Sequence, residues 1–331
     1  MKILFAIQAT GNGHISRARE ILPQLQKHGE VDIAISGTQN DVWLDEKIKY
    51  KYKGISYTFG KKGGVDIWDT VIKLAPVSFI NNVINCPVKD YDIVINDFEP
   101  VTAWACKLKG KACIALSHQS AFLSEKTPRP KSRDAFAEGL FRNFAPSSKA
   151  IGLHFKSYDS YIKTPIIRSE IRKLNTSNKG HVTVYLPAYS DKTLCEIFKP
   201  MNDLQWHVFS KHTKRKYELN NCLVLPIENE QYLQSLEGSE GLLTGGGFEA
   251  PAEGLHLGKK VLVVPMAYQY EQLCNAEAFR QIGGTLLTRM DASATESIKN
   301  WILGTKPINI SYPDQTESII KELIASNHNQ I

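Results

Sequence analysis

The sequence predicts an α/β protein of two tandem domains, each a doubly wound parallel sheet with helices on both faces. Short apolar strands alternate with helical patterns almost throughout, which is typical of parallel sheets covered on both sides. The 331 residues also exceed the length at which a single hydrophobic core is usual. Because ligands of such sheets bind beyond the carboxyl ends of the strands, we expect the two domains to face each other across a cleft that holds the site.

In the first half, apolar runs bounded by turn residues predict the strands, and longer periodic segments predict the helices. The first domain is expected over residues 1–165. Its expected strands are 2–7, 31–35, 55–59, 93–96 and 112–116, and its expected helices are 16–27, 67–84 and 100–109.

The second half begins after residues 161–180, a stretch rich in Pro, Ser and charge. A new series of strands follows, and helices are expected to begin near Phe248 and at Glu271. The second domain is expected over residues 166–314. Its expected strands are 181–186, 206–210, 222–225, 241–244 and 261–264.

Composition and charge limit the classes of protein to which the chain can belong. Apolar residues make up 42% of the chain, and no apolar run approaches the about 20 residues that span a bilayer. The six cysteines are scattered without a Cys-x-x-Cys pair, which favours reduced core residues of a cytoplasmic protein. Residues 1–165 hold 23 Lys and Arg against 16 Asp and Glu, a net charge of +7. This half is expected to favour an anionic partner.

A glycine turn in the second half is the most informative motif. Gly245, Gly246 and Gly247 stand between an expected strand and an expected helix. Such a turn lets the backbone approach a ligand closely and directs N–H groups at it, which suits phosphate. Glu253 follows Gly247 by six residues, and its carboxylate could accept hydrogen bonds from a ribose. The alternative is an ordinary loop between a strand and a helix.

This run resembles the donor-binding motif of GT-B fold glycosyltransferases, in particular the UDP-glucuronosyltransferase-like group and the N-acetylglucosaminyltransferase that makes lipid II. The resemblance implies two Rossmann-like domains. It assigns the diphosphate to Gly246 and Gly247, the ribose to Glu253, and the donor sugar to Glu271 and Gln272. Gly245 stands where many members carry His, so backbone amides are expected to contribute more here.

The resemblance extends to both halves of the chain. Residues 164–168 resemble the interdomain segment, and a last helix at 315–327 is expected to cross back to the first domain, so residues 315–331 are assigned to it. Ser190, after a strand, is placed to meet the diphosphate, and the backbone of Ile227 to pair with the base edge; generic loops would look the same. Asn275 and Ala276 are expected to be packing residues.

The loop after the first strand carries Gly11, Gly13 and His14. It is not Gly-x-Gly-x-x-Gly, so a dinucleotide site is disfavoured. It resembles the Gly-x-Gly-His loop of the same glycosyltransferases, whose His faces the cleft. A neutral imidazole, with an ordinary pKa of about 6.5, can accept a proton from a hydroxyl group. His14 is therefore the predicted catalytic base, and a helix-start residue is its alternative.

Four other side chains are candidate site residues near His14, at the carboxyl ends of the expected strands. Asp97 ends a strand and is expected to stabilise the imidazolium, or alternatively to cap the following helix. Glu99 is the reserve base, and His118 is expected to line the acceptor pocket. Arg17 is expected to contact phosphate or an acidic acceptor, unless it is simply solvated.

Two further charged segments stand out in the first half of the chain. The basic run 126–133 is expected to be a loop, either plain surface or a site for an anionic acceptor or lipid headgroup. Asp90-Tyr91-Asp92 mimics a metal motif of the other major glycosyltransferase fold, but it precedes its strand. We therefore predict no metal site.

These observations predict a metal-independent, inverting glycosyltransferase that moves a sugar from a nucleoside diphosphate, UDP by resemblance, to a hydroxyl acceptor. No cofactor and no nucleic acid partner are expected. The acceptor is expected to be anionic or lipid-linked, with the protein cytoplasmic and in peripheral contact with the inner membrane face. Two alternatives stay open: a nucleotide-sugar epimerase or hydrolase of the same fold, and a binding protein that has lost the chemistry.

Overall fold

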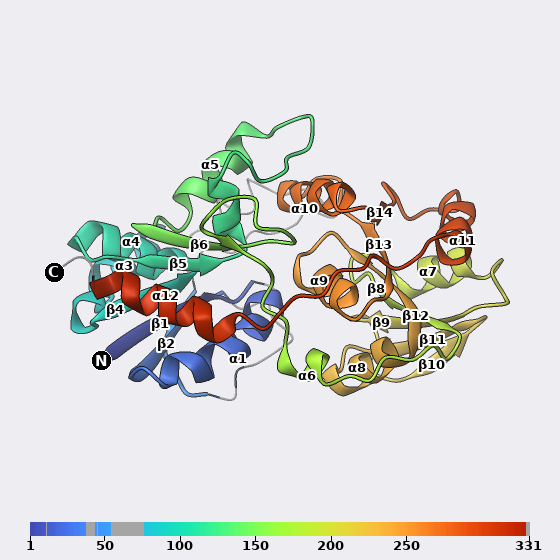
Figure 1. Cartoon of the computed structure of the whole chain (residues 1–331), viewed down its shortest axis with the longest axis horizontal. Helices are drawn as coiled ribbons and strands as arrows, with labels where there is room; N and C mark the ends of the chain where they lie inside the picture. Colours follow the sequence, from blue (N-terminus) through green and yellow to red (C-terminus); the bar gives the residue numbers. More distant parts are fainter. Residues whose placement is uncertain (11, 38–43, 45, 54–75, 329–331) are drawn as a thin grey trace. The chain divides into compact units, whose positions relative to one another are not determined.

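The structure is a computed structural model that describes residues 1–331 except 11, 38–43, 45, 54–75 and 329–331. The chain forms two compact units (Figure 1). Unit 1 comprises Met1–Thr127, Arg133–Arg168 and Pro313–Ile331, and unit 2 comprises Pro128–Ser132 and Ser169–Tyr312.

Unit 1 contains, in its described residues, a seven-stranded parallel sheet in the order β3-β2-β1-β4-β5-β6-β7. The central strands are apolar and buried, as expected for a sheet covered on both faces. The strands are β1 (Lys2–Gln8), β2 (Glu30–Ser36), β3 (Ile48–Tyr52), β4 (Ile93–Asp97), β5 (Ile114–Ser117), β6 (Lys149–Leu153) and β7 (Ile162–Lys163).

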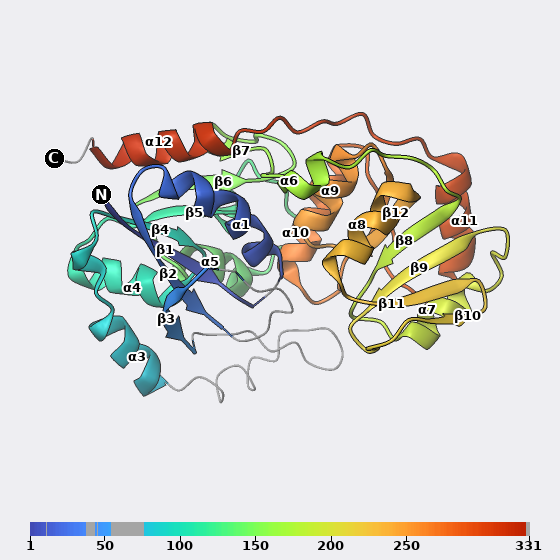
Figure 2. The ribbon, with the colours of Figure 1, turned by 90° about the horizontal axis from the view of Figure 1, so that it is seen from below.

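Helices cover this sheet. On one face, Leu4 and Ala6 of β1 pack with Val101 and Cys106 of α4 in a buried cluster. α12 packs against α1, and Figure 2 shows the two helices side by side. The helices are α1 (Asn12–Gln26), α3 (Pro76–Asn85), α4 (Pro100–Lys109), α5 (Ala135–Asn143) and α12 (Thr316–His328), with 3-10 helices η1 (Val88–Asp90) and η2 (Gln119–Leu123).

Unit 2 repeats the architecture with the strand order β10-β11-β9-β8-β12-β13-β14. All pairs are parallel except β10 with β11. The strands are β8 (His181–Tyr185), β9 (Gln205–Ser210), β10 (Tyr217–Leu219), β11 (Cys222–Pro226), β12 (Ser239–Gly245), β13 (Lys260–Val264) and β14 (Thr285–Leu286).

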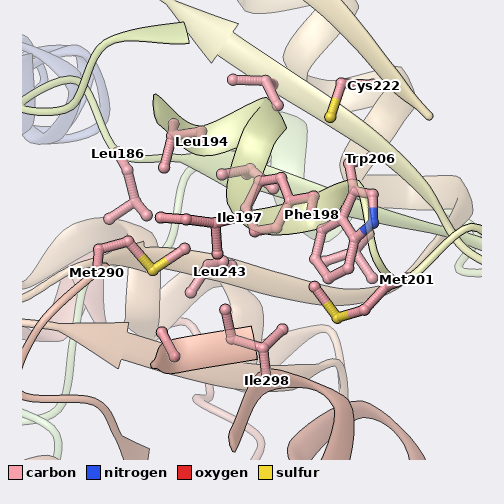
Figure 3. Packing of buried hydrophobic residues seen from close by; sticks show 14 of the residues in the cluster. Leu186, Leu194, Ile197, Phe198, Met201, Trp206, Cys222, Leu243, Met290 and Ile298 are labelled. Carbon is pink, nitrogen blue, oxygen red and sulfur yellow. The ribbon is translucent and has the colours of Figure 1, made fainter. Parts of the chain in front are cut away.

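One core cluster of unit 2 lies between its sheet and the helices α7 and α11 (Figure 3). Phe198 of α7 stacks on Trp206 of β9 with ring centroids 4.1 Å apart, and Ile298 of α11 joins the same cluster. The helices are α6 (Ser169–Arg172), α7 (Asp191–Phe198), α8 (Asn229–Gly238), α9 (Glu249–His256), α10 (Tyr270–Gln281) and α11 (Ala294–Gly304).

The predicted fold class is confirmed, with differences in detail. α1 begins at Asn12 rather than at Ser16, so the candidate base lies inside the helix. The expected strand 55–59 and the first part of the expected helix 67–84 lie outside the described residues. All six cysteines are buried and unpaired, which confirms them as core residues.

Candidate functional site

The carboxyl ends of β1, β4 and β5 bring three polar side chains together in unit 1. These strands are neighbours in the sheet, with Ile7 of β1 opposite Asp97 of β4. His14 lies in the first turn of α1 after β1, Asp97 is the last residue of β4, and Gln119 follows β5. Parallel strands thus place residues that are far apart in sequence at one edge.

His14, Asp97 and Arg17 form a compact group. His14 Nδ1 lies 2.9 Å from Asp97 Oδ1. Arg17 Nη2 donates to both oxygens of Asp97, at 2.7 and 2.9 Å, and lies 3.1 Å from His14 Nδ1. The side chain of Asp97 is fully buried, that of Arg17 is 2% exposed, and that of His14 is 13% exposed. Only the imidazole therefore reaches solvent to an appreciable degree.

Two groups meet His14 Nδ1, the carboxylate of Asp97 and the guanidinium of Arg17. When Nδ1 carries the proton, it donates to Asp97, whereas the approach of Arg17, which only donates, suits an unprotonated Nδ1. The amide Nε2 of Gln119 approaches His14 Nε2 at 3.5 Å, and a donor there suits an unprotonated nitrogen. In the tautomer with the proton on Nδ1, Nε2 is the atom that can accept a proton.

Asp97 is held in its ionised form. Burial alone would raise its pKa, but the charge of Arg17, the charge that His14 carries when it is protonated, and the hydrogen bonds from both hold the pKa below its ordinary value. An ionised carboxylate against Nδ1 would stabilise an imidazolium if His14 accepted a proton.

The turn after Asp97 separates it from the next acid. Phe98 has a positive φ of 57°, a conformation rare for side chains other than Gly. Glu99 then caps α4 by accepting from the amides of Val101 and Thr102. The alternative that Asp97 caps this helix is therefore wrong, because Glu99 does so.

Glu99 is also a poor reserve base. Its carboxylate is fully buried and accepts from the hydroxyls of Ser36 and Thr102 as well as from the two amides. Burial raises its pKa, and these hydrogen bonds offset only part of that rise. The side chain supports the helix start.

Two expectations on the acceptor side are revised. His118 does not line an open pocket: its side chain is buried, its Nδ1 bonds the carbonyl of Leu153, and its ring contacts Phe122 and His154. Its neighbour Gln119 reaches His14 instead, a residue that the sequence argument missed although it follows the same strand. Arg17 is neither solvated nor open to phosphate, because it binds Asp97.

The remaining candidates of the first domain are the glycines before His14 and the basic run 126–133. Gly13 lies in the first turn of α1, and Gly11 lies outside the described residues. Acids partner several cations in and near the basic run: Lys126 pairs with Asp159, and Arg133 and Arg142 pair with Glu125. These pairs reduce its attraction for an anion.

The second group lies at the carboxyl ends of β8, β12 and β13 in unit 2. None of Gly245, Gly246 and Gly247 has a positive φ, so conformational freedom is not why glycine is needed. A Cβ on Gly246 would lie 2.9 Å from Gln272 Cβ and 3.0 Å from Pro265. A Cβ on Gly247 would meet nothing within 4 Å. Gly246 permits a close backbone approach, whereas Gly247 faces open space.

Neutral amide side chains of α10 hold this turn. Gln272 Oε1 accepts from the backbone N–H of Gly246 at 3.2 Å and from that of Met266 at 2.9 Å. Asn275, which is buried, donates to the carbonyl of Gly246 at 3.1 Å. Gln272, expected to touch the donor sugar, therefore positions the glycine turn in this structure, and Asn275 has the packing role expected of it.

The other candidates surround this turn. Glu253 lies on α9 and is 5% exposed, and Glu271 lies in the first turn of α10. Ser190 caps α7 by accepting from the amide of Thr193, and Ile227 follows β11. Ser190 and Ile227 thus follow parallel strands of the same sheet as the glycine turn.

In the part of the chain that the structure describes, no group of three His, Cys, Asp or Glu side chains is arranged to hold a metal ion. No helix among the described residues is long and apolar enough to cross a membrane.

Comparison with known proteins gives a family match over most of the chain. The family model described as glycosyl transferase family 1 matches residues 1–303. A search of curated proteins found no match.

Solved structures share the fold at low sequence identity. UGT89C1 of Arabidopsis thaliana complexed with UDP has a TM-score of 0.63 and 11% identity, covering 99% of each chain. MurG of Acinetobacter baumannii has a TM-score of 0.57 and 14% identity, covering 98% of this chain and 100% of its own. SnogD, a glycosyltransferase of Streptomyces nogalater, has a TM-score of 0.52 and 14% identity, covering 98% and 99%. These likenesses identify the fold as GT-B.

Proposed function

Because the chain belongs to glycosyl transferase family 1, we propose that it moves a sugar from a UDP-linked donor to a hydroxyl group of an acceptor. Transfer proceeds with inversion at the anomeric carbon and without a metal ion. Unit 1 supplies the base and contacts the acceptor, and unit 2 binds the donor.

The pair of His14 and Asp97 carries this proposal. His14 Nε2 accepts the proton of the acceptor hydroxyl while its oxygen attacks the anomeric carbon. The bond from that carbon to the diphosphate oxygen breaks, and the diphosphate leaves with the electron pair. One direct displacement inverts the configuration. Asp97, held ionised at 2.9 Å from Nδ1, stabilises the imidazolium.

The glycine turn supports the donor assignment. It leads directly into α9, and a helix N-terminus carries partial positive charge that stabilises a leaving diphosphate. UGT89C1, which shares the fold, is known in complex with UDP and with UDP-L-rhamnose. In this proposal Glu253 binds the ribose and Glu271 the sugar, while Ser190 contacts the diphosphate and Ile227 the base. No cofactor takes part.

A donor screen followed by a turnover assay tests the proposal. UDP, dTDP and GDP and their sugars are compared by thermal shift, since a ligand at about 100 times its Kd stabilises a fold by about 2.7 kcal/mol. The best donor is then incubated with and without hydroxyl acceptors, with EDTA present, and products are followed by NMR. Transfer with inversion supports the proposal. Donor conversion without any acceptor indicates the epimerase or hydrolase, and binding without turnover indicates the inactive binding protein.

We also propose that the acceptor is lipid-linked and that unit 1 contacts an anionic membrane at the cytoplasmic side. Nine large apolar side chains are exposed in the described part of the chain, and four of them lie on the adjacent helices α3 and α4. These four, Val77, Ile80, Ile84 and Leu108, are the α3–α4 face. Neither helix contains Asp or Glu, and α4 ends with Lys107 and Lys109. Apolar contact together with positive charge suits anionic lipid.

Vesicle sedimentation tests this surface. The protein should bind vesicles containing anionic phosphatidylserine at low salt and bind less at 0.15 M, where the Debye length is about 8 Å. Val77→Ser with Ile80→Ser should reduce binding, whereas Leu303→Ser, an exposed leucine of α11, should not. Equal binding of both variants, or no binding at low salt, overturns the membrane proposal and leaves the transfer proposal standing.

A further inference from the structure

Two stacked histidines lie beside the end of α8 in unit 2, outside the candidate site. The imidazole rings of His181 on β8 and His207 on β9 have centroids 3.9 Å apart and lie within 17° of parallel. Both rings contact Ser235 of α8. We propose that the His181–His207 pair is an acid-sensitive element, which holds the end of α8 against the sheet while it is neutral and loosens that end when it is protonated.

Hydrogen bonds join the pair to α8, which packs against β8 and β12. His181 Nε2 lies 2.8 Å from the carbonyl oxygen of Ser235 and, farther away, 3.4 Å from its Oγ. Because a carbonyl only accepts hydrogen bonds, this nitrogen carries a proton and donates it. His207 Nδ1 lies 3.0 Å from Ser235 Oγ, which lies 2.8 Å from Thr183 Oγ1. The two imidazoles thus contact both the backbone and the side chain of one residue of α8.

Protonation of His207 would limit the ways in which these hydrogen bonds can be made. An unprotonated Nδ1 can accept from the hydroxyl of Ser235, which can itself accept from Thr183. An imidazolium has a donor on both nitrogens, so Ser235 Oγ would have to accept from Nδ1 and direct its own proton elsewhere. Thr183 is fully buried, so water cannot replace a partner that its hydroxyl loses.

Positive charges act on the pair from three segments. Lys179 precedes β8, Lys216 precedes β10, and Lys259 precedes β13. Burial, together with the charges of Lys259 and Lys179, lowers the pKa of His181 and outweighs the opposing effect of the Ser235 carbonyl. Burial, His181 and Lys216 lower the pKa of His207 to about 4. The pair is therefore neutral at neutral pH, and a charge on one ring opposes a charge on the other.

The end of α8 is closely packed around the same groups. Lys259 Nζ donates to the carbonyl of Glu237 at 2.8 Å and to that of Ser239 at 2.6 Å. A Cβ on Gly238, the last residue of α8, would lie 3.2 Å from Cε1 of His181. A charge gained by the pair would therefore arise beside a fixed ammonium group at a tightly packed helix end.

Acidification should weaken this helix end. The ordinary pKa of a histidine is about 6.5, and both residues have lower pKa values in the fold. Their contribution to stability is therefore present above pH 6.5 and is lost as the pH falls through the lowered values. With a pKa of about 4 for His207, the equilibrium constant for opening of α8 should rise roughly 10- to 20-fold between pH 7 and pH 5.

Hydrogen exchange tests the proposal in the full chain. Peptides that cover α8 are followed by mass spectrometry at pH 7, 6 and 5, and their rates are corrected for the intrinsic pH dependence of exchange. Protection of α8 in the wild type should fall roughly 10- to 20-fold from pH 7 to pH 5, and the fall should be much smaller in His207→Gln. His212→Gln, which removes an exposed histidine from the segment after β9, is the matched control and should keep the wild-type pH dependence.

Two results would overturn the proposal. One is protection of α8 that does not fall towards pH 5, and the other is an equal fall in His207→Gln and the wild type. If His207→Gln does not fold, NMR titration of ¹⁵N-labelled histidine in the wild type decides, with His207 assigned by its through-space contacts to His181. A midpoint well below pH 6.5 supports the proposal, and a midpoint at or above 6.5 refutes it. Neither measurement needs a donor or an acceptor, so the outcome is independent of the proposed function.

Discussion

Unit 1 builds its candidate site from charged side chains, whereas unit 2 builds its own from glycine backbone and neutral amides. In unit 1, a histidine, an aspartate and an arginine contact one another within 3.1 Å. In unit 2, Gln272 and Asn275 hold Gly246 through its N–H and its carbonyl. One fold therefore supports two kinds of site at the same edge of its sheet.

The difference follows from the chemistry that each site would perform. Proton transfer needs a titratable group whose protonation state is controlled, so its neighbours are charged. Binding of a diphosphate needs directed N–H groups and room, so the neighbours of the turn are small or neutral. Substitutions in unit 1 should therefore change rate, and those in unit 2 should change binding or stability.

The largest effect is expected from His14→Ala. Transfer should fall by roughly 10²- to 10⁴-fold because the general base is lost, while donor affinity should hardly change. Product formation and isothermal calorimetry with the donor measure the two effects. His28→Gln, a histidine in the turn after α1, is the matched control and should be fully active. Near wild-type transfer by His14→Ala would refute the assignment, and joint loss of donor binding would move His14 to the diphosphate site.

The second largest effect is expected in unit 2, on nucleotide binding. Glu253→Ala should weaken nucleotide binding by roughly 1.5 to 3 kcal/mol, the cost of a lost hydrogen bond to a charged group. Calorimetry with UDP measures it. Glu296→Ala, an exposed acid in the first turn of α11, should bind as the wild type does. Unchanged affinity in a folded Glu253→Ala protein removes this residue from the site.

The glycine turn should respond to added volume at one position only. Gly246→Ala should lower the free energy of unfolding by about 1 to 3 kcal/mol, because its Cβ would overlap Gln272 and Pro265. Gly247→Ala is the matched control and should leave stability nearly unchanged, since nothing lies within 4 Å. Urea unfolding of both variants decides the point; equal losses would show that the close approach is not the constraint.

The smallest effects are expected from pH, and they differ in sign within unit 1. Burial opposes ionisation of Asp97, yet Arg17 and His14 hold its pKa below 3.8. Its contribution to stability is present above that ordinary value and is lost as the pH falls through the lowered pKa. Burial raises the pKa of Glu99 above 4.5, so its contribution is present below 4.5 and is lost as the pH rises through the raised pKa.

Unfolding at a series of pH values checks both signs. As the pH rises, Asp97→Asn should become less stable relative to the wild type below pH 3.8, and Glu99→Gln should become more stable relative to it above pH 4.5. If the stability of both variants relative to the wild type changed with pH in the same direction, the pKa values of Asp97 and Glu99 would not be shifted in opposite directions.

The fold could be predicted because its central strands are apolar runs that are bounded by turn residues in the sequence. The strand at 261–264 and the helix at 100–109 were placed within one residue of β13 and α4. The short strands β7, β10 and β14 escaped prediction because each is too short to show a pattern of its own.

The candidate residues could be predicted more readily than their partners. The position of His14 after a strand and that of Asp97 at a strand end predicted that they lie at one edge. The pairing of Arg17 with Asp97 depends on the register of β1 with β4 and on the first turn of α1, which sequence spacing alone does not specify. The capping by Glu99 depends on the positive φ of Phe98. A phenylalanine in the sequence gives no indication of a positive φ, so this cap could not be predicted.

Residues from the end of the chain complete unit 1, which contains His14. α12 packs on α1, Lys149 bonds the carbonyl of Ser326, and Lys163 pairs with Glu322 at 2.8 Å. During synthesis, all of Ser169–Tyr312 leaves the ribosome before α12 does. Unit 2 can therefore close while α1, with His14 and Arg17, still lacks its covering helix. The nascent chain can thus complete unit 2 before α12 completes unit 1.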